Sequence, residues 1–224
     1  MCNFKAGIVF RTGELFTSPF TDSHEDLILL RGLKDDRAPI VQNWARVEYL
    51  PDSEWKTWTL SLDEQQAPAW WDDDMRTAII AKFEALIEGM TITRTVPMLL
   101  GGQYILRGNA NVAKLGNGAH VVVMRDSSNV GEMWGSSKVV EMRESSNVGE
   151  MWESSNVGMM GGSSNVGEMR ESSNVGEMRG SSNVGVMGGS SNVGVMRESS
   201  KVVVMRCSSK APRKPASDRR TTGQ

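Results

Sequence analysis

The residue best suited to covalent chemistry is Cys2. Removal of the initiating methionine succeeds when the following residue is small, and it would leave the Cys2 thiol beside a free amine. A thiol with an adjacent base is a design for nucleophilic catalysis. His24, in the stretch "DSHEDL", is the candidate general base. The alternative gives both residues structural roles, with Cys2 starting a strand and His24 in the first turn of a helix.

The start "MCNFKAGIVF" resembles the class II glutamine amidotransferases, which begin Met-Cys-Gly and run into a strand. The resemblance implies an N-terminal cysteine nucleophile, which falls on Cys2. It covers only the cysteine and the strand: Asn3 stands where that family has glycine, and the non-repetitive stretch is too short for the amidotransferase domain. The sequence therefore favours a non-enzymatic protein, with a Cys2 hydrolase or amidotransferase as the alternative.

Two further groups of residues could hold a metal ion. The three carboxylates of "DDD" at 72–74 could bind a cation, or they could begin a helix, where one caps it and all complement its dipole. The methionines repeated from Met124 to Met205 could present sulfur to Cu(I), or they could fill a core. The acidic calcium signature of nonapeptide β-rolls is absent. We expect neither a metal nor a cofactor.

The methionines belong to a nine-residue repeat. Counted from Ser127, the repeat is S-S-N-V-G-E-M-R-E and recurs to Ser199, with degenerate copies from Asn109 and Gly118. Column four is always Val, and column seven is Leu or Met. A helix is disfavoured because nine residues are about 2.5 turns, which would place successive apolar pairs on opposite sides. The repeats therefore predict a β-solenoid (β-helix) with Val and Met inside, Ser-Ser-Asn at the corners and a bend at column-five glycine.

The number of repeats in one coil is left open. Column-eight and column-nine residues often match at a spacing of 27, as Arg143, Arg170 and Arg197 do. Three repeats per coil would stack these arginines, but duplication of a segment of three repeats would give the same pattern. Two repeats per coil would instead stack Trp134 on Trp152. The handedness of the solenoid also stays open.

The outward columns predict where a partner would bind. Trp134 and Trp152 are exposed aromatics on a rigid face, and Arg143, Arg170 and Arg197 lie in the same column. Exposed aromatic and arginine side chains are typical of protein contact surfaces. Acidic and basic residues are nearly balanced in the repeats, which argues against a nucleic-acid-binding rod. We expect a protein partner on this face and make no prediction of the oligomeric state.

The stretch before the repeats predicts a small α+β domain over residues 1–96. "AGIVF", "ARVEYL" and "WKTWTLSL" alternate as strands, and "SHEDLILLRGL" predicts a short helix that Ser23 and Asp26 cap and Gly32 ends. "WWDDDMRTAIIAKFEALIEGM" predicts an amphipathic helix. We expect this domain also to cap the solenoid, which we place at 97–207.

The remaining residues, 208–224, are rich in proline and basic side chains and predict a disordered tail. Contact with nucleic acid through this tail is an alternative function. The formal charge of the chain is −2, and neither a signal peptide nor a membrane span is recognisable. We expect no contact with a membrane and a cytoplasmic protein, in a host cytoplasm or a phage particle.

Taken together, "MCNFKAGIVF", "TDSHEDLI", "RVEYLP" and the tandem repeats resemble a group of uncharacterised phage and prophage proteins. Members of that group start Met-Cys-Asn-Phe-Lys and end in short tandem repeats of variable number. The resemblance implies a mobile-element origin and brings no activity with it. The predicted fold is an α+β N-terminal domain followed by a β-solenoid of nonapeptide repeats, acting as a structural or protein-interaction module.

Overall fold

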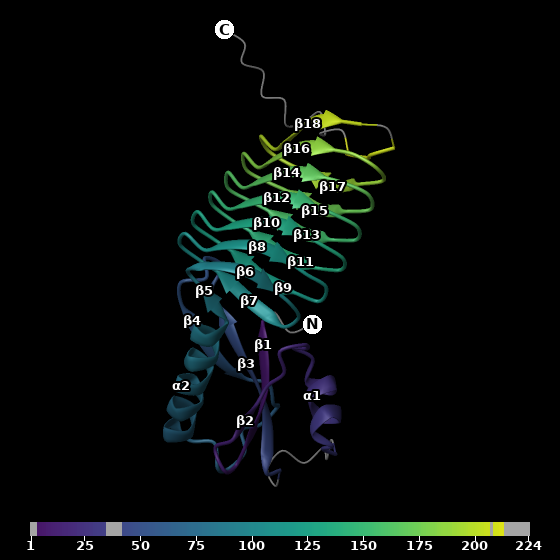
Figure 1. Cartoon of the computed structure of the whole chain (residues 1–224). Coiled ribbons are helices and arrows are strands. Elements are labelled where there is room, and N and C mark those ends of the chain that lie inside the picture. Colours follow the sequence, from purple (N-terminus) through teal and green to yellow (C-terminus); the bar gives the residue numbers. More distant parts are fainter. Residues whose placement is uncertain (1–3, 35–41, 207, 213–224) are drawn as a thin grey trace. The chain divides into compact units, whose positions relative to one another are not determined.

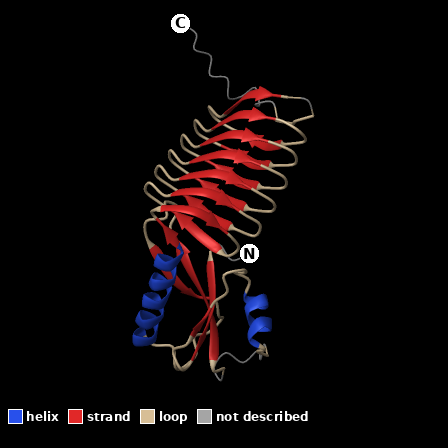
Figure 2. Ribbon diagram, viewed as in Figure 1, coloured by secondary structure: helices blue, strands red, loops and turns tan. Residues whose placement is uncertain are grey.

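The computed structural model describes residues 4–34, 42–206 and 208–212. The chain divides into two compact parts, Met1–Gly89 and Met90–Gln224. We call them the N-terminal domain and the solenoid and describe each by itself. Among the described residues, helices occur only up to Met90, and the chain beyond forms short strands joined by tight turns (Figure 2). The predicted order of an α+β domain and a β-solenoid is confirmed.

The N-terminal domain contains a four-stranded antiparallel sheet in the order β2-β1-β3-β4. Its strands are β1 (Lys5–Phe10), β2 (Leu15–Phe16), β3 (Trp44–Pro51) and β4 (Trp58–Leu62). Glu48 pairs with Ser61 across β3 and β4, and Asp63 follows directly after β4. The alternation that predicted the strands is confirmed, because Ala45, Val47 and Tyr49 of β3 are all buried.

Two helices accompany this sheet, α1 (His24–Arg31) and α2 (Asp73–Met90). The Ser23 side chain accepts a hydrogen bond from the Asp26 N–H, and Gly32 ends α1 with a φ of 67°. The Asp26 carboxylate accepts instead from the Thr21 hydroxyl at 2.7 Å. Asp72 accepts from the Met75 N–H at 2.8 Å and so caps α2, as one interpretation of the aspartate run predicted.

Aromatic side chains fill much of the core of the N-terminal domain. Phe83 of α2 stacks on Tyr49 of β3, with ring centroids 5.1 Å apart, and Tyr49 stacks in turn on Trp58 of β4. Ile79, Phe83 and Ile87 are the buried residues of α2, and their spacing gives the helix one apolar face. This packing holds α2 against β3 and β4.

The solenoid consists of two parallel seven-stranded sheets. Successive strands alternate between the sheets, so the chain climbs one strand on each side per coil (Figure 1). The even sheet contains β6 (Thr95–Leu99), β8 (Asn111–Leu115), β10 (Asn129–Met133), β12 (Asn147–Met151), β14 (Asn165–Met169), β16 (Asn183–Met187) and β18 (Lys201–Met205). The odd sheet contains β5 (Thr91–Ile92), β7 (Gln103–Leu106), β9 (His120–Met124), β11 (Lys138–Met142), β13 (Asn156–Met160), β15 (Asn174–Met178) and β17 (Asn192–Met196).

The register of the strands shows that one coil holds two of the nine-residue repeats. Val130 of β10 pairs with Val148 of β12, and Met133 pairs with Met151. Side chains follow the same spacing, since the Asn147 amide donates to the Asn129 amide oxygen at 2.8 Å. The matches at a spacing of three repeats do not stack, because an odd number of repeats moves a residue to the other sheet.

The valines of column four and the methionines of column seven form the core of the solenoid. Val130 and Met133 point inward although they are three residues apart, and Gly131 between them is skipped in the strand pairing. A Cβ on Gly131 would lie 2.6 Å from the Ala113 carbonyl oxygen. The predicted bend at column five is confirmed, and it lets two residues of one short strand face the core.

Most corners are tight turns whose second residue, in column nine, has a positive φ, whereas at the corner after β8 the positive φ falls on Gly118 in column one. At the corner after β10, the Ser137 N–H donates to the Trp134 carbonyl at 3.2 Å. Positive φ favours glycine, yet acidic residues also occupy this column, at Asp126, Glu144, Glu153, Glu171 and Glu198. The column-two serines that close the corners are buried, as Ser128 and Ser137 are.

Strand pairing of the solenoid begins before residue 97, where we placed its start. Thr91 of β5 pairs with Ile105, and Thr95 of β6 pairs with Asn111, so the first coil precedes the recognisable repeats. At the other end, Lys210 forms a bridge with Asn192, which extends the stacking into the segment predicted as a tail. Residues 213–224 of that tail lie outside the described residues. Within the described chain, no helix is long and apolar enough to cross a membrane.

Candidate protein-binding face of the solenoid

The outer surface of the even sheet carries a column of aromatic and cationic side chains, which we call the tryptophan ladder: Lys114, Trp134, Trp152 and Arg170. The rings of Trp134 and Trp152 lie one coil apart, with centroids separated by 5.1 Å and planes inclined by 4°. The Lys114 ammonium lies 5.8 Å from the Trp134 centroid, and the Arg170 guanidinium lies 4.2 Å from that of Trp152. A cation therefore lies over each end of the aromatic stack.

The two indole rings are offset rather than superimposed. Stacked carbons touch at about 3.5–4.0 Å, so parallel rings with centroids 5.1 Å apart must be displaced sideways. Offset stacking suits the ring quadrupoles and contributes about 0.5–1.5 kcal/mol beyond burial. Each ring has one face against the other ring and one face under a cation. What the ladder offers a partner is therefore the edges of the indoles.

Carboxylates run beside the ladder in column six of the even sheet. Glu132 accepts a hydrogen bond from the Trp134 indole N–H at 2.7 Å and pairs with Lys114 at 3.0 Å. These contacts, the indole hydrogen bond first, hold the pKa of Glu132 below its ordinary value. Glu168 pairs with Arg170 at 2.8 Å, and Glu150 lies 3.9 Å from the same guanidinium. The ladder and its carboxylates carry three negative and two positive groups.

The three arginines singled out with the tryptophans do not share a face. Arg170 follows the even strand β14 and belongs to the ladder, whereas Arg143 and Arg197 follow the odd strands β11 and β17. Arg143 pairs there with Glu141 at 2.7 Å, and Arg197 pairs with Glu177 at 2.6 Å. The predicted set thus divides into Trp134, Trp152 and Arg170 on one sheet and two ion-paired arginines on the other.

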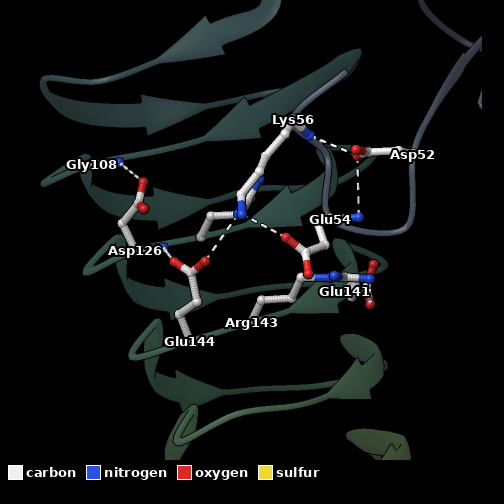
Figure 3. Close-up of polar contacts among 9 residues, drawn as sticks. Asp52, Glu54, Lys56, Gly108, Asp126, Glu141, Arg143 and Glu144 are labelled. Atoms are coloured by element: carbon white, nitrogen blue, oxygen red, sulfur yellow. Dashed lines mark hydrogen bonds and ion pairs between the residues drawn. The ribbon is translucent and has the colours of Figure 1, made fainter. Parts of the chain in front are cut away.

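At the odd-sheet corners, acidic side chains connect successive coils (Figure 3). The Asp126 carboxylate accepts the Gly108 N–H at 2.7 Å, and the Glu144 carboxylate accepts the Asp126 N–H at 2.6 Å. Glu144 also pairs with Arg125 at 3.0 Å. Each carboxylate thus satisfies a backbone donor of the coil before it. These residues hold the stack together, which leaves the odd side less suited to recruit a partner than the ladder.

The catalytic candidates divide between described and undescribed residues. His24 is 4% exposed at the start of α1, where its Nε2 lies 3.1 Å from the Val47 carbonyl oxygen and its Nδ1 lies 3.1 Å from Asp63 Oδ2. Its packing agrees with the structural interpretation of a first-turn residue. Cys2 lies outside the described residues, so its pairing with His24 stays a prediction.

Several residues that matter here were not singled out from the sequence. Lys114 lies in a degenerate repeat and joins the ladder only because two repeats make one coil. Glu48 and Asp63 lie close to His24, with ligand atoms of all three within 4.8 Å of one another. The pairing of β3 with β4 brings the two acids together, and the intervening turn did not reveal that register. Knowing the coil length would have identified Lys114.

The methionines are not arranged as a sulfur array for a metal. Column seven points into the solenoid as far as Met196, although Met205 in the last strand is 47% exposed. Met133, Met142, Met151 and Met160 have no exposed surface. Of the two interpretations weighed for them, core packing is the one the structure supports. Comparison with known protein families, curated proteins and solved structures finds no match to this chain.

Proposed function

We propose that this chain is a non-enzymatic binding module, and that its solenoid presents the tryptophan ladder to a partner protein. The observation that carries the proposal is the stack of Trp134 on Trp152 in a fixed geometry on the outside of the even sheet. Tryptophan and arginine dominate the energetics of protein interfaces, and rigid side chains lose little entropy on binding. The phage or prophage origin remains an expectation that this proposal does not require.

The chemistry of the face favours a partner with an apolar contact surface and basic side chains at its rim. The indole edges provide apolar area, while Glu132, Glu150 and Glu168 beside them exceed the two cations of the ladder. Both cations are already engaged by the rings and by these carboxylates. Charge complementarity would therefore come from basic groups of the partner.

The repeat itself supplies matched variants to test the proposal. Column eight holds glycine at Gly116, Gly161 and Gly188, so Trp134→Gly with Trp152→Gly removes the ladder without introducing a foreign residue. Arg143→Gly with Arg197→Gly is the control on the odd sheet. The full-length chain and both variants are incubated with extract of the cells that encode the protein. A recovered partner is then purified and its Kd for each form is measured.

We expect the purified partner to bind the full-length chain and the odd-sheet variant with equal Kd, and the ladder variant at least about 30-fold more weakly, the effect of losing about 2 kcal/mol of hot-spot contacts. Equal binding to all three forms would contradict the proposal, as would binding lost only in the odd-sheet variant. Circular dichroism verifies that each variant retains the solenoid.

A further inference from the structure

The N-terminal domain brings one imidazole and two carboxylates together from separate elements. His24 begins α1, Glu48 lies in β3, and Asp63 follows β4. The His24 side chain is almost fully buried, Glu48 is partly buried, and the Asp63 side chain is 57% exposed. The three sets of ligand atoms lie within 4.8 Å of one another. This cluster lies outside the solenoid face to which the proposed function belongs.

The hydrogen bonds of His24 favour a cation at its Nδ1. The Val47 carbonyl oxygen, 3.1 Å from Nε2, can only accept, so Nε2 carries a proton. Nδ1 faces the Asp63 carboxylate oxygen at 3.1 Å, and an ionised carboxylate also only accepts. Two lone pairs would otherwise oppose each other. A metal ion bound to both atoms, or a proton shared between them, removes this repulsion.

The geometry around Nδ1 suits a metal ion. Divalent transition metal ions such as zinc bind histidine nitrogen and carboxylate oxygen at about 2.0–2.2 Å, so neighbouring ligand atoms of one ion lie about 2.8–3.6 Å apart, from octahedral to tetrahedral angles. The separation of 3.1 Å between His24 Nδ1 and Asp63 Oδ2 falls in this range. A carboxylate oxygen of Glu48 lies within 4.8 Å of both atoms. Histidine ligands of metals also typically donate their other ring N–H to a backbone carbonyl, as Nε2 does to Val47.

The charges around the cluster also favour a divalent ion. The basic side chain two residues before Glu48 on β3, Arg46, donates to both carboxylate oxygens of Glu64, at 3.2 and 3.4 Å. Glu64 therefore offsets the charge of Arg46. Glu25, the neighbour of His24 on α1, accepts from the Ser23 hydroxyl. Glu48 and Asp63 bring two carboxylates within 4.8 Å of the His24 imidazole, and a divalent ion would offset the charge of both.

We propose that His24, Glu48 and Asp63 bind one divalent first-row transition metal ion. The imidazole ligand selects such an ion over Ca²⁺ and Mg²⁺, which prefer oxygen. Three protein ligands leave at least one coordination position for water, and the exposure of Asp63 gives the ion access from solvent. Because the ligands come from α1, β3 and the end of β4, the bound ion fastens the helix to the sheet and stabilises the N-terminal domain.

The test uses Co²⁺ and Zn²⁺ as probes of the full-length chain. Co²⁺ binding is followed by its visible absorption, and Zn²⁺ stoichiometry is measured by equilibrium dialysis. The chain has two histidines and two cysteines, so His120→Ala is the matched control, and Cys2→Ser with Cys207→Ser excludes thiol ligands. Asp63→Asn is the main variant because its exposed, isosteric replacement leaves the fold intact; Glu48→Gln and His24→Ala complete the set.

We expect one equivalent of metal in the full-length chain, in the His120→Ala control and in the cysteine-free form. Asp63→Asn and Glu48→Gln should each raise the Kd for the metal by at least about tenfold, because loss of a residue that only supports a metal ligand already lowers metal affinity by that factor. His24→Ala should abolish binding. Saturating Zn²⁺ should raise the thermal midpoint of the N-terminal domain only in those forms of the chain that bind the metal. Absence of saturable binding overturns the proposal. Binding that Asp63→Asn leaves unchanged overturns it as well.

Discussion

At the scale of single residues, the corners of the solenoid bury small polar side chains in column two. Its column-two serines are buried, and the hydroxyls of Ser146 and Ser164 have no hydrogen-bond partner among the described residues, whereas the Ser200 hydroxyl near the C-terminal end donates to the Arg197 carbonyl at 2.6 Å. The two degenerate repeats hold Ala110 and Ala119 in the same place, both buried. A small side chain is what the corner requires, and the hydroxyl is incidental to it.

Replacement of a buried column-two serine by alanine should therefore not destabilise the solenoid. We expect Ser146→Ala to leave the free energy of unfolding unchanged or to raise it by up to about 1 kcal/mol, because an unsatisfied buried hydroxyl is removed. Ser146→Val, which overfills the corner, should lower it by about 1–3 kcal/mol. Chemical denaturation measures both. A loss of more than about 1 kcal/mol in Ser146→Ala would show that the hydroxyl has a stabilising partner.

The acidic residues of column nine have a backbone conformation with positive φ, which favours glycine. Glu171 has a φ of 54°, where glycine is the residue without steric cost. We expect Glu171→Gly to stabilise the solenoid by about 1 kcal/mol. The control Glu168→Gly, within strand β14, should destabilise it by about 0.5–1 kcal/mol. Thermal unfolding distinguishes the two, and a destabilised Glu171→Gly variant would contradict the prediction.

At the scale of the strands and their stacks, the core depends on one valine and one methionine per strand. Met151 has no exposed surface, and the same column holds Leu115 in the degenerate repeat from Asn109. We expect Met151→Ala to cost about 2–5 kcal/mol through the cavity it leaves, and Met151→Leu to cost less than about 1.5 kcal/mol. Denaturation with urea measures both variants. Equal losses in the two would show that the column is not packed as described.

The ion pairs of the odd sheet predict how the stack responds to acid. Hydrogen bonding to Arg179, and then to Arg197, keeps the pKa of Glu177 below its ordinary value of 4.5. A lowered pKa in the folded state means that the stabilisation is complete above pH 4.5 and is lost as the pH falls through the lowered pKa. The pairs are exposed, so the effect is small.

We therefore expect Glu177→Gln to lower the thermal midpoint by about 1–3 °C near neutral pH and to leave it unchanged at about pH 2. Glu153→Gln, at an even-sheet corner, serves as the control and should have little effect at either pH. Differential scanning calorimetry at both values makes the comparison. A difference between Glu177→Gln and the natural chain that persists at low pH would contradict the origin assigned to it.

At the scale of the whole molecule, much of the architecture followed from periodicity. The fixed spacing of Val and Met implied a β-solenoid with both inside, and glycine in column five implied the bend between them. The coil length did not follow, because residues in the variable columns often match three repeats apart, whereas the strands pair two repeats apart. Only backbone pairing distinguishes the two, since every repeat has the same inward residues and fits either sheet equally well.

The binding face was predictable only in part for the same reason. Trp134 and Trp152 were predicted to be exposed aromatics, but both are half-buried in the structure; their spacing of two repeats gave the stack once the coil length was known. Arg143 and Arg197 were grouped with Arg170 because the three arginines are spaced three repeats apart. The structure places Arg143 and Arg197 on the other sheet. The cluster of His24, Glu48 and Asp63 depends on tertiary pairing of distant elements, which the local pattern does not contain.

The coil of two repeats underlies the ladder and the proposed binding face, and pairs of cysteines test it most directly. In a chain carrying Cys2→Ser and Cys207→Ser, Glu150→Cys is combined either with Glu168→Cys, two repeats on, or with Glu177→Cys, three repeats on. Glu150 and Glu168 are direct partners on neighbouring parallel strands, a separation that a disulfide can bridge. Mild oxidation should cross-link the first pair readily and leave the second as free thiols. A disulfide that forms in the second pair and not in the first would contradict the coil and the face built on it.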